Sequence, residues 1–214
     1  EIAQSEGYDY ISVAHHKDDQ AESILAHIIR GSGLNGLTGM SVVQSEYAIP
    51  VVRPLLDVTK EDLLAYIGTK HISYCVDSTN EDVRYQRNRI RHRIIPELEV
   101  VNPAVVDAIV RLGSSVNEDV MVISDLTSRT FDKLVSIGDD EVRISRRALR
   151  QEPLAIQRRL WQRLVSTIDS DLTLTSAHQE QLLDIVNTGE KKTFTIKSIK
   201  VIAQCDTIKV YCKH

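Results

Sequence analysis

The sequence predicts an α/β fold with an incomplete parallel sheet, followed by a mainly α-helical domain with a small β tail. Up to about residue 95, short apolar runs alternate with segments of helical periodicity, which is typical of a parallel sheet with crossover helices. Beyond that point, long segments repeat apolar residues at helical spacing. The stretch 193–212 alternates apolar and polar residues, as terminal strands do. We therefore predict two domains, residues 1–95 and 96–214.

The first domain reads as alternating strands and helices. Its predicted elements are a strand at 10–14, a helix at 19–30, a glycine-rich loop at 31–39, a strand at 48–56, a helix at 59–70, and a strand with its exit loop at 72–80. Thr59 and Asp62 have the spacing of a capping box. The loop contains G-x-G-x-x-G at 31–36, but a dinucleotide fingerprint needs a strand before it. Here a helix precedes the motif, so we interpret it as a flexible loop.

The second domain reads as three helices and a strand tail. The predicted helices begin at Asn102-Pro103, near Pro153 and at Ser176, and the last stops at Gly189. Asp206-Thr207 is predicted as a turn between terminal strands.

Composition excludes several classes of protein. The chain of 214 residues has a net charge of −4, so contact with RNA must come from local basic patches. Its three cysteines, Cys75, Cys205 and Cys212, form no C-x-x-C pair, which argues against zinc and favours a reducing, cytoplasmic location. No apolar run is long enough to span a membrane, so no membrane partner is expected.

The segment HHKDDQAE, residues 15–22, carries two imidazoles and several acids where a strand gives way to a helix. Asp19 and Glu22 are three apart and share a helix face. Helix capping explains the two acids equally well. Capping does not explain His15 and His16, which follow the strand at the edge where open parallel sheets bind ligands. A metal site built from His15, Asp19 and Glu22 has no standard spacing, and we predict none.

A second cluster, RYQRNRIRHRIIPEL at 84–98, holds five arginines: Arg84, Arg87, Arg89, Arg91 and Arg93. On a helix Arg84, Arg87 and Arg91 lie near one another. A solvated basic face is one interpretation. Phosphate binding is the other, because arginine is the favoured bidentate partner of phosphate.

A weaker basic group follows later in the chain, for which RNA contact and a plain helix surface are equally open. Its members are Arg143, Arg146, Arg147, Arg150, Arg158, Arg159 and Arg163.

Four segments in order are HHKDDQAESILAHIIRGSGLNGLTGM, RPLLDVTKEDLLAYI, DSTNEDVRYQRNRIRHRIIPEL and the Asn-Pro at 102–103. Together they resemble the tRNA(Ile)-lysidine synthetase family of PP-loop ATP pyrophosphatases, with a match from residue 1 to about 112. EPLAIQRRLWQRLV, at 152–165, resembles the helical domain that follows in that family. The resemblance implies a Rossmann-like sheet of the PP-loop ATPase type in residues 1–95 and a tRNA-binding domain in residues 96–214.

The resemblance also implies a reaction. The family adenylates the wobble cytidine of tRNA(Ile) with a CAU anticodon, using ATP and Mg²⁺, and L-lysine then displaces AMP to give lysidine. The family's S-G-G-x-D-S loop for ATP does not occur in this chain. The chain is therefore expected to be a fragment that begins past the loop, to be inactive alone, and not to bind ATP measurably.

By resemblance, Asp19 and Glu22 hold the lysine, and one of them or His15 takes its proton. Arg87, Asn88 and Arg91, with Arg30 as a lesser candidate, meet ATP or tRNA phosphates. Neutralising a free lysine amine, whose reference pKa is about 10.4, costs roughly 4.6 kcal/mol at pH 7, so a site with carboxylates could offset much of this cost.

Two alternatives stay open from the sequence. Another PP-loop enzyme, such as a tRNA thiolase, is the nearest, although Cys75 is the only cysteine of residues 1–95. Residues 96–214 alone could instead serve as a non-catalytic module for tRNA docking or for formation of a homodimer.

Overall fold

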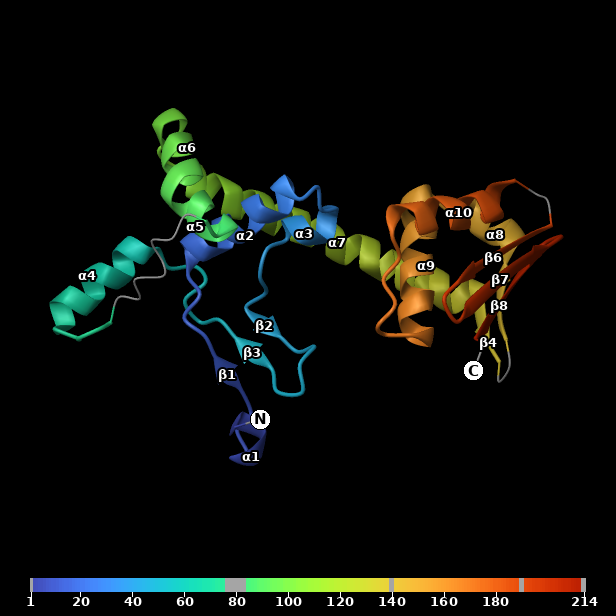
Figure 1. Ribbon diagram of the computed structural model, residues 1–214, viewed down its shortest axis with the longest axis horizontal. Helices are drawn as coiled ribbons and strands as arrows, with labels where there is room; N and C mark the ends of the chain where they lie inside the picture. The colour runs from blue at the N-terminus through green and yellow to red at the C-terminus, as the bar shows by residue number, and fades with distance from the viewer. Residues whose placement is uncertain (1, 76–83, 139–140, 189–190, 213–214) are drawn as a thin grey trace. The chain divides into compact units, whose positions relative to one another are not determined.

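The computed structural model describes residues 2–75, 84–138, 141–188 and 191–212. The chain forms two compact units, Glu1–Val120 and Met121–His214, and each unit is described by itself. Figure 1 shows the order of their helices and strands.

A small mixed sheet lies in the first unit. Its strands β1 (Ile11–Ser12), β2 (Val43–Gln44) and β3 (Val51–Val52) are arranged in the order β1-β3-β2. β1 and β3 are parallel, as predicted for the strands at 10–14 and 48–56, whereas β2 was not predicted and pairs antiparallel with β3. The described part of the predicted strand at 72–80, residues 72–75, is not a strand, and the rest of that prediction lies outside the described residues.

The helices of the first unit account for most of its length. They are α1 (Ile2–Ser5), α2 (Lys17–Ile29), α3 (Leu34–Leu37), α4 (Lys60–Lys70), α5 (Gln86–Arg89), the π-helical segment η2 (Ile90–Ile94), α6 (Ile95–Val101) and the part of α7 (Val105–Leu134) that precedes residue 121. The predicted N-cap of α4 is confirmed, because Asp62 donates its backbone N–H to the Thr59 hydroxyl at 3.1 Å. The reciprocal half of the predicted capping box differs, since the Asp62 carboxylate accepts from the Thr59 hydroxyl at 2.6 Å and not from the Thr59 backbone N–H.

Helix α2 begins two residues earlier than predicted, with His16 as its N-cap. Ala21 and Ile24 of α2 are fully buried and pack against Ile109 of α7. A close approach makes this packing possible, since a Cβ at Gly113 would lie 2.7 Å from the Ile24 Cδ1 atom. The contact fixes α2, and with it the acidic residues at its N-terminus.

The boundary between the two compact units falls at residues 120 and 121, inside α7, and not near residue 95. The physical reason is that Ile109 at the start of α7 belongs to the apolar cluster of α2. The predicted functional division into residues 1–95 and 96–214 stays a prediction.

In the residues that the structure describes, the second unit combines the C-terminal part of α7 and further helices with a five-stranded antiparallel sheet. Its strands are β4 (Val135–Ile137), β5 (Val142–Ser145), β6 (Lys192–Ile196), β7 (Ile199–Gln204) and β8 (Thr207–Cys212), in the order β4-β5-β8-β7-β6. Its other helices are α8 (Arg146–Gln151), α9 (Leu154–Ile168) and α10 (Ser176–Asn187), which lie beside this sheet in Figure 1. One core joins helices and sheet, with Trp161 of α9 and Ile199 of β7 almost fully buried.

The predictions for this unit are confirmed in outline. The predicted helices near Pro153 and Ser176 are α9 and α10, although Thr175, not Ser176, caps α10. The sheet is larger than the predicted β tail, because β4 and β5 extend it across β8. These two strands are only three and four residues long, too short for alternation to reveal them.

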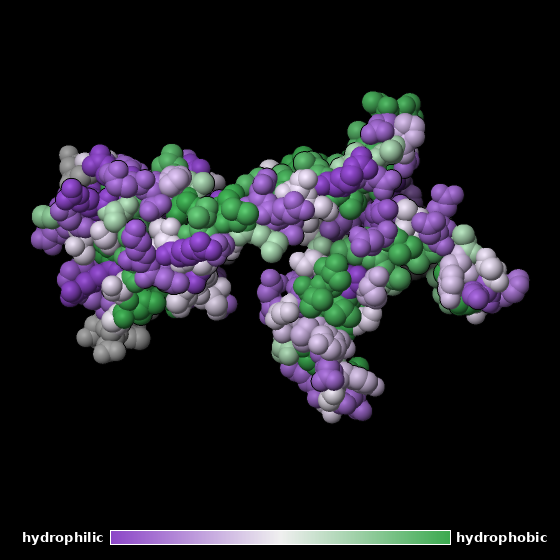
Figure 2. All heavy atoms as spheres, turned by 180° about the vertical axis from the view of Figure 1, so that it is seen from behind, coloured by the Kyte–Doolittle hydropathy of each residue, from purple (hydrophilic) through white to green (hydrophobic). Residues whose placement is uncertain are grey.

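Apolar side chains remain on the surface of the first unit, on the arm that carries β1–β3 (Figure 2). Tyr10, Val42 and Val43 are among these exposed residues. Within the described ranges, none of the helices has the length and apolar character needed to cross a membrane.

Candidate active site

Two acidic side chains of α2 are withdrawn from water. The exposed fraction of Asp19 is 6% and that of Glu22 is 1%. A Rossmann-like order of elements places them just after β1, near the carboxyl end of the parallel pair β1–β3. Asp19 also caps its own helix, since its Oδ2 accepts a hydrogen bond from the His16 N–H at 3.0 Å. Asp19 can therefore cap the helix through Oδ2 and still offer Oδ1 to an active site.

Arg87 and Arg91 meet both acids directly. Arg87 donates from Nε to Glu22 Oε2 and from Nη2 to Asp19 Oδ1, both at 2.8 Å. Arg91 donates from Nε to Glu22 Oε1 at 2.5 Å, and from Nη2 to Asp19 Oδ1 and Glu22 Oε2, both at 2.9 Å. Two negative and two positive groups form a balanced cluster, and every carboxylate oxygen accepts at least one hydrogen bond.

The two arginines differ in their contact with water. The side chain of Arg87 is 47% exposed and that of Arg91 is 22% exposed. The hydrogen bond to Glu22, more than any other interaction, raises the pKa of Arg91 above its usual value. Among the described residues, Nη1 of neither guanidinium has a partner. Each arginine thus keeps a face that could meet an anion.

A change of helix type helps to bring these arginines to α2. Arg87 lies on α5 and Arg91 on η2, a π-helical segment that joins α5 to α6. Ile90, between them, is fully buried and anchors the segment. π-Helical turns are rare and are often found at functional sites.

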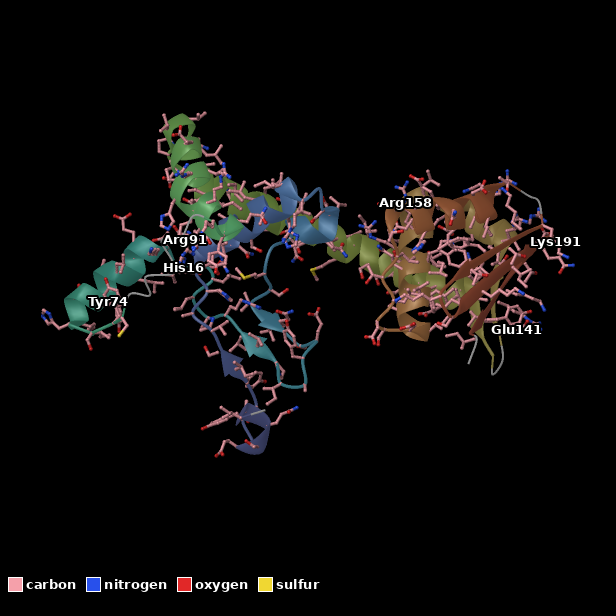
Figure 3. All side chains as sticks on the ribbon, in the orientation of Figure 1. His16, Tyr74, Arg91, Glu141, Arg158 and Lys191 are labelled. Carbon is pink, nitrogen blue, oxygen red and sulfur yellow. The ribbon has the colours of Figure 1, made fainter. Side chains whose placement is uncertain are left out.

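His16 and Asp18 extend the cluster toward α4. The His16 ring lies 3.3 Å from Asp18 through Nδ1 and 3.3 Å from Asp19 through Nε2. Asp18 Oδ2 accepts from the backbone N–H of Lys60, at the start of α4. Hydrogen bonding to His16, followed by that to Lys60, lowers the pKa of Asp18 to about 2. Figure 3 shows His16 and Arg91 where α2 meets the arginine-bearing segment.

His15 has a partner that the sequence did not reveal. Arg53 follows β3 directly and donates from Nε to His15 Nδ1 at 3.2 Å. Ser41 O and Gln44 Oε1 accept from the same guanidinium at 2.9 and 2.8 Å. Burial, and to a lesser extent the charges of Arg87 and Arg53, lowers the pKa of His15. The signal in the sequence was a lone arginine within the apolar run at 48–56, because a buried arginine needs partners.

Of the other predicted site residues, one lies next to the cluster in the chain and one lies far from it. Asn88 is 9% exposed and lies between Arg87 and Arg91 in the chain. Arg30 is exposed at the C-cap of α2, eleven residues beyond Asp19 and roughly 16 Å along the helix axis. The structure brings together Asp19, Glu22, Arg87 and Arg91, with His15 nearby, and does not bring Arg30 to them.

A glycine fixes the loop beside the site. The side chain of Gln20 donates to Met40 O at 3.0 Å and accepts from Met40 N at 2.7 Å. Gly39 has φ +72°, and a Cβ there would lie 2.6 Å from the Gln20 amide. Gln20 also lines a pocket of about 420 Å³ that contains Asp57 and Glu118 and no basic side chain. The described residues contain no group of three histidine, cysteine or acidic side chains that could hold a metal ion.

Comparison with known proteins identifies a known domain in this part of the chain. Residues 1–98 match the PP-loop domain. A tRNA(Ile)-lysidine synthase of Porphyromonas gingivalis is 44% identical over 103 residues, which are 48% of this chain and 22% of that protein. The enzyme of the same name from Caldanaerobacter subterraneus is 29% identical over 207 residues, 96% of this chain and 42% of its own length. The one from Bacillus subtilis is 30% identical over 88% of this chain and 41% of its own length.

The chain therefore contains a PP-loop domain in its first 98 residues. It is a homologue of tRNA(Ile)-lysidine synthases, and spans between 22% and 42% of the length of the relatives described above.

Proposed function

We propose that this chain carries the lysine-transferring site of a tRNA(Ile)-lysidine synthase. In this reaction the 2-oxygen of the wobble cytidine attacks the α-phosphorus of MgATP, and pyrophosphate leaves. The ε-ammonium of L-lysine first gives up a proton, the neutral amine attacks C2 of the adenylated cytidine, and AMP leaves with the oxygen. One observation carries the proposal: the acidic pair Asp19 and Glu22 lies against the arginines of the second motif.

The charges of the cluster suggest how lysine enters. All four carboxylate oxygens already accept hydrogen bonds, so an ammonium group can bind only if one arginine gives way. Arg87 makes two hydrogen bonds and is half exposed, whereas Arg91 makes three and is largely covered. We therefore assign Arg87 as the group that leaves and Arg91 as the group that stays.

An exchange of cations keeps the buried acids neutralised at every stage. When Arg87 swings toward the phosphate of ATP or of departing AMP, the lysine ammonium takes its place at Asp19 Oδ1 and Glu22 Oε2. Neither step leaves a buried carboxylate unpaired, a situation that costs several kcal/mol. Arginine at the phosphate then stabilises the negative charge that develops as AMP leaves. Asn88, next to Arg87, is placed to join it.

The proton of lysine goes to a carboxylate in this mechanism. Arg53 donates to His15 Nδ1, so the neutral ring carries its hydrogen on Nε2 and can only donate from that atom. His15 is therefore assigned as a donor to a substrate oxygen and not as the base. Asp19 is the acceptor that we propose, because it is more exposed than Glu22.

The test is lysine transfer by the protein that carries this chain, with ATP, Mg²⁺, labelled L-lysine and unmodified tRNA(Ile) with a CAU anticodon. We expect labelled lysine on the tRNA, none on a tRNA whose wobble cytidine is replaced by uridine, and one AMP released per lysine. Asp19→Asn is expected to lower transfer by about 10²-fold or more. Asp119→Asn, at an exposed position of α7 outside the pocket that Gln20 lines, is the matched control and should leave transfer unchanged.

A folded protein that transfers no lysine to the cytidine tRNA contradicts the proposal. Transfer near the wild-type rate by Asp19→Asn would limit Asp19 to a structural role, in helix capping and in the ion pairs with Arg87 and Arg91. The cytoplasmic location and the homodimer stay predictions.

A further inference from the structure

The second unit contains a pocket of about 570 Å³ that the proposed reaction does not use. Its lining comes from α8, from the end of α10 and from the turn between β7 and β8. The lining residues are Arg146, Arg147, Arg150, Gln151, Val186, Cys205 and Asp206. We propose that this pocket binds a phosphate group. The inference concerns the second unit and does not depend on the proposed role of the PP-loop domain.

Arg146 lines the buried side of the pocket, and its exposed fraction is 3%. Its Nε donates to Val186 O at 3.4 Å and its Nη1 to Cys205 O at 3.3 Å. Its backbone N–H donates to Asp206 O at 2.8 Å. Carbonyl oxygens orient a guanidinium without removing its charge. The pocket therefore has a positive group that is held in place before any ligand arrives.

Arg147 and Arg150 form the exposed rim. Arg150 is three residues from Arg147 and four from Arg146 on α8, so its side chain neighbours each of them on the helix surface. Like charges at this spacing destabilise a helix. In the part of the chain that the structure describes, neither Arg147 nor Arg150 has an ion-pair partner. Bound phosphate would relieve this repulsion.

The balance of charge at the pocket favours an anion. Three arginines and one acid, Asp206, line it, which gives three positive charges minus one negative, or +2. The whole chain, by contrast, has a net charge of −4. Guanidinium groups match the oxygens of a phosphate bidentately. A pocket of this volume also has room for the molecule that carries the phosphate.

The phosphate could belong to an RNA backbone or to a small phosphorylated metabolite, and an exposed cysteine in the pocket lets one experiment distinguish them. Cys205 lines the pocket and Cys75 is exposed in the other unit. We would measure alkylation of each cysteine by anionic iodoacetate and by neutral iodoacetamide, peptide by peptide, by mass spectrometry. The ratio of the two rates is expected to be several-fold higher at Cys205 than at Cys75, because the arginines attract the anion.

Inorganic phosphate, added at increasing concentration, is expected to lower the iodoacetate rate at Cys205 and not at Cys75. The double variant R147Q/R150Q should bring the ratio at Cys205 close to that at Cys75. The matched control is R129Q/R158Q, which removes the same two charges from exposed positions outside the pocket. It should leave the ratio and the phosphate effect unchanged.

Binding of unmodified tRNA then identifies the source. If the phosphate is part of an RNA backbone, R147Q/R150Q weakens tRNA binding and reduces the slope of log K against log salt by about 1. If tRNA binding is unchanged while inorganic phosphate still protects Cys205, the ligand is a small phosphorylated molecule. Equal alkylation ratios at both cysteines, with no protection by phosphate or tRNA, would overturn the inference.

Discussion

Arg91 holds Glu22 with two sides of its guanidinium, Nε on Oε1 at 2.5 Å and Nη2 on Oε2 at 2.9 Å. Glu22 is 1% exposed, so this pair supplies the countercharge for a carboxylate that water hardly reaches. Bidentate pairs of this kind are stronger and more specific than single contacts. The geometry makes Arg91 a fixed part of the site and leaves Arg87 as the exchangeable arginine.

Glu22→Gln is expected to destabilise the first unit by about 2–3 kcal/mol. Loss of one partner from a buried ion pair costs about 3–5 kcal/mol, and the cost expected here lies at or below the lower end of that range because both arginines keep some contact with water. Urea denaturation measures the change in the free energy of unfolding. The control is Glu118→Gln, an exposed glutamate of α7. A change below 0.5 kcal/mol for Glu22→Gln, roughly the range of an ordinary surface substitution, would show that the acid is not tied to the arginines.

Arg87→Gln is expected to tighten the binding of L-lysine while it slows lysine transfer. Arg87 competes with the lysine ammonium for Asp19 and Glu22, so its removal leaves the acids open. Removal also takes away the charge that meets the phosphate. Calorimetry measures lysine binding, and the transfer assay gives the Michaelis constant for lysine separately from turnover.

Arg91→Gln is the comparison for that experiment. Because Arg91 makes three of the bonds to the acids and is mostly covered, its loss should lower stability more than the loss of Arg87. Weaker lysine binding by Arg87→Gln than by the wild type would rule out the exchange of cations.

The sequence located the two halves of this cluster but not the contact between them. Asp19 and Glu22 were recognisable from their spacing, and Arg87 and Arg91 from their local density in an acidic chain. Their contact joins segments more than sixty residues apart, which helical periodicity does not encode. Arg53 was not predicted as a site residue, because its role depends on the parallel pairing of β1 with β3. That pairing brings Arg53 to His15.

The fold was predictable to a similar degree. Long amphipathic helices such as α9, and a capped helix such as α4, carry their signal in neighbouring residues. The two-residue strand β2 and the short strands β4 and β5 exist because other strands pair with them. Segments of two to four residues are too short for an alternating apolar pattern, so the sequence does not predict that pairing.

His15 is expected to make the free energy of unfolding fall as the pH is lowered below about 6.5, its pKa in the unfolded chain. Its pKa in the folded protein is lower, chiefly because of burial, so the unfolded chain binds more protons in this range. Stability then rises with pH and is lost as pH falls from 6.5 through the folded pKa. Urea denaturation between pH 5 and pH 8 should show a shallower dependence for His15→Gln.

The lowered pKa of His15 can also be measured in the folded protein. An NMR titration of the His15 ring gives its pKa directly, and Arg53→Gln should raise that pKa by removing a neighbouring positive charge. A wild-type His15 pKa at or above 6.5 would contradict both the linkage and the assignment of His15 as a neutral donor.

Gly39→Ala and Gly33→Ala are expected to have opposite effects, although both glycines lie in the same loop region. Gly39 has φ +72°, and an added Cβ would collide with the Gln20 amide that clamps Met40. Its replacement should destabilise the protein by more than about 1 kcal/mol, because alanine is strained at positive φ and the Gln20 clamp must shift. Gly33 has φ −71° and open space around it, so alanine there should be neutral or should stabilise by about 0.4–1 kcal/mol through the unfolded chain. Urea denaturation of both variants decides the question, and equal effects would mean that the Gln20 clamp does not hold the loop beside the site.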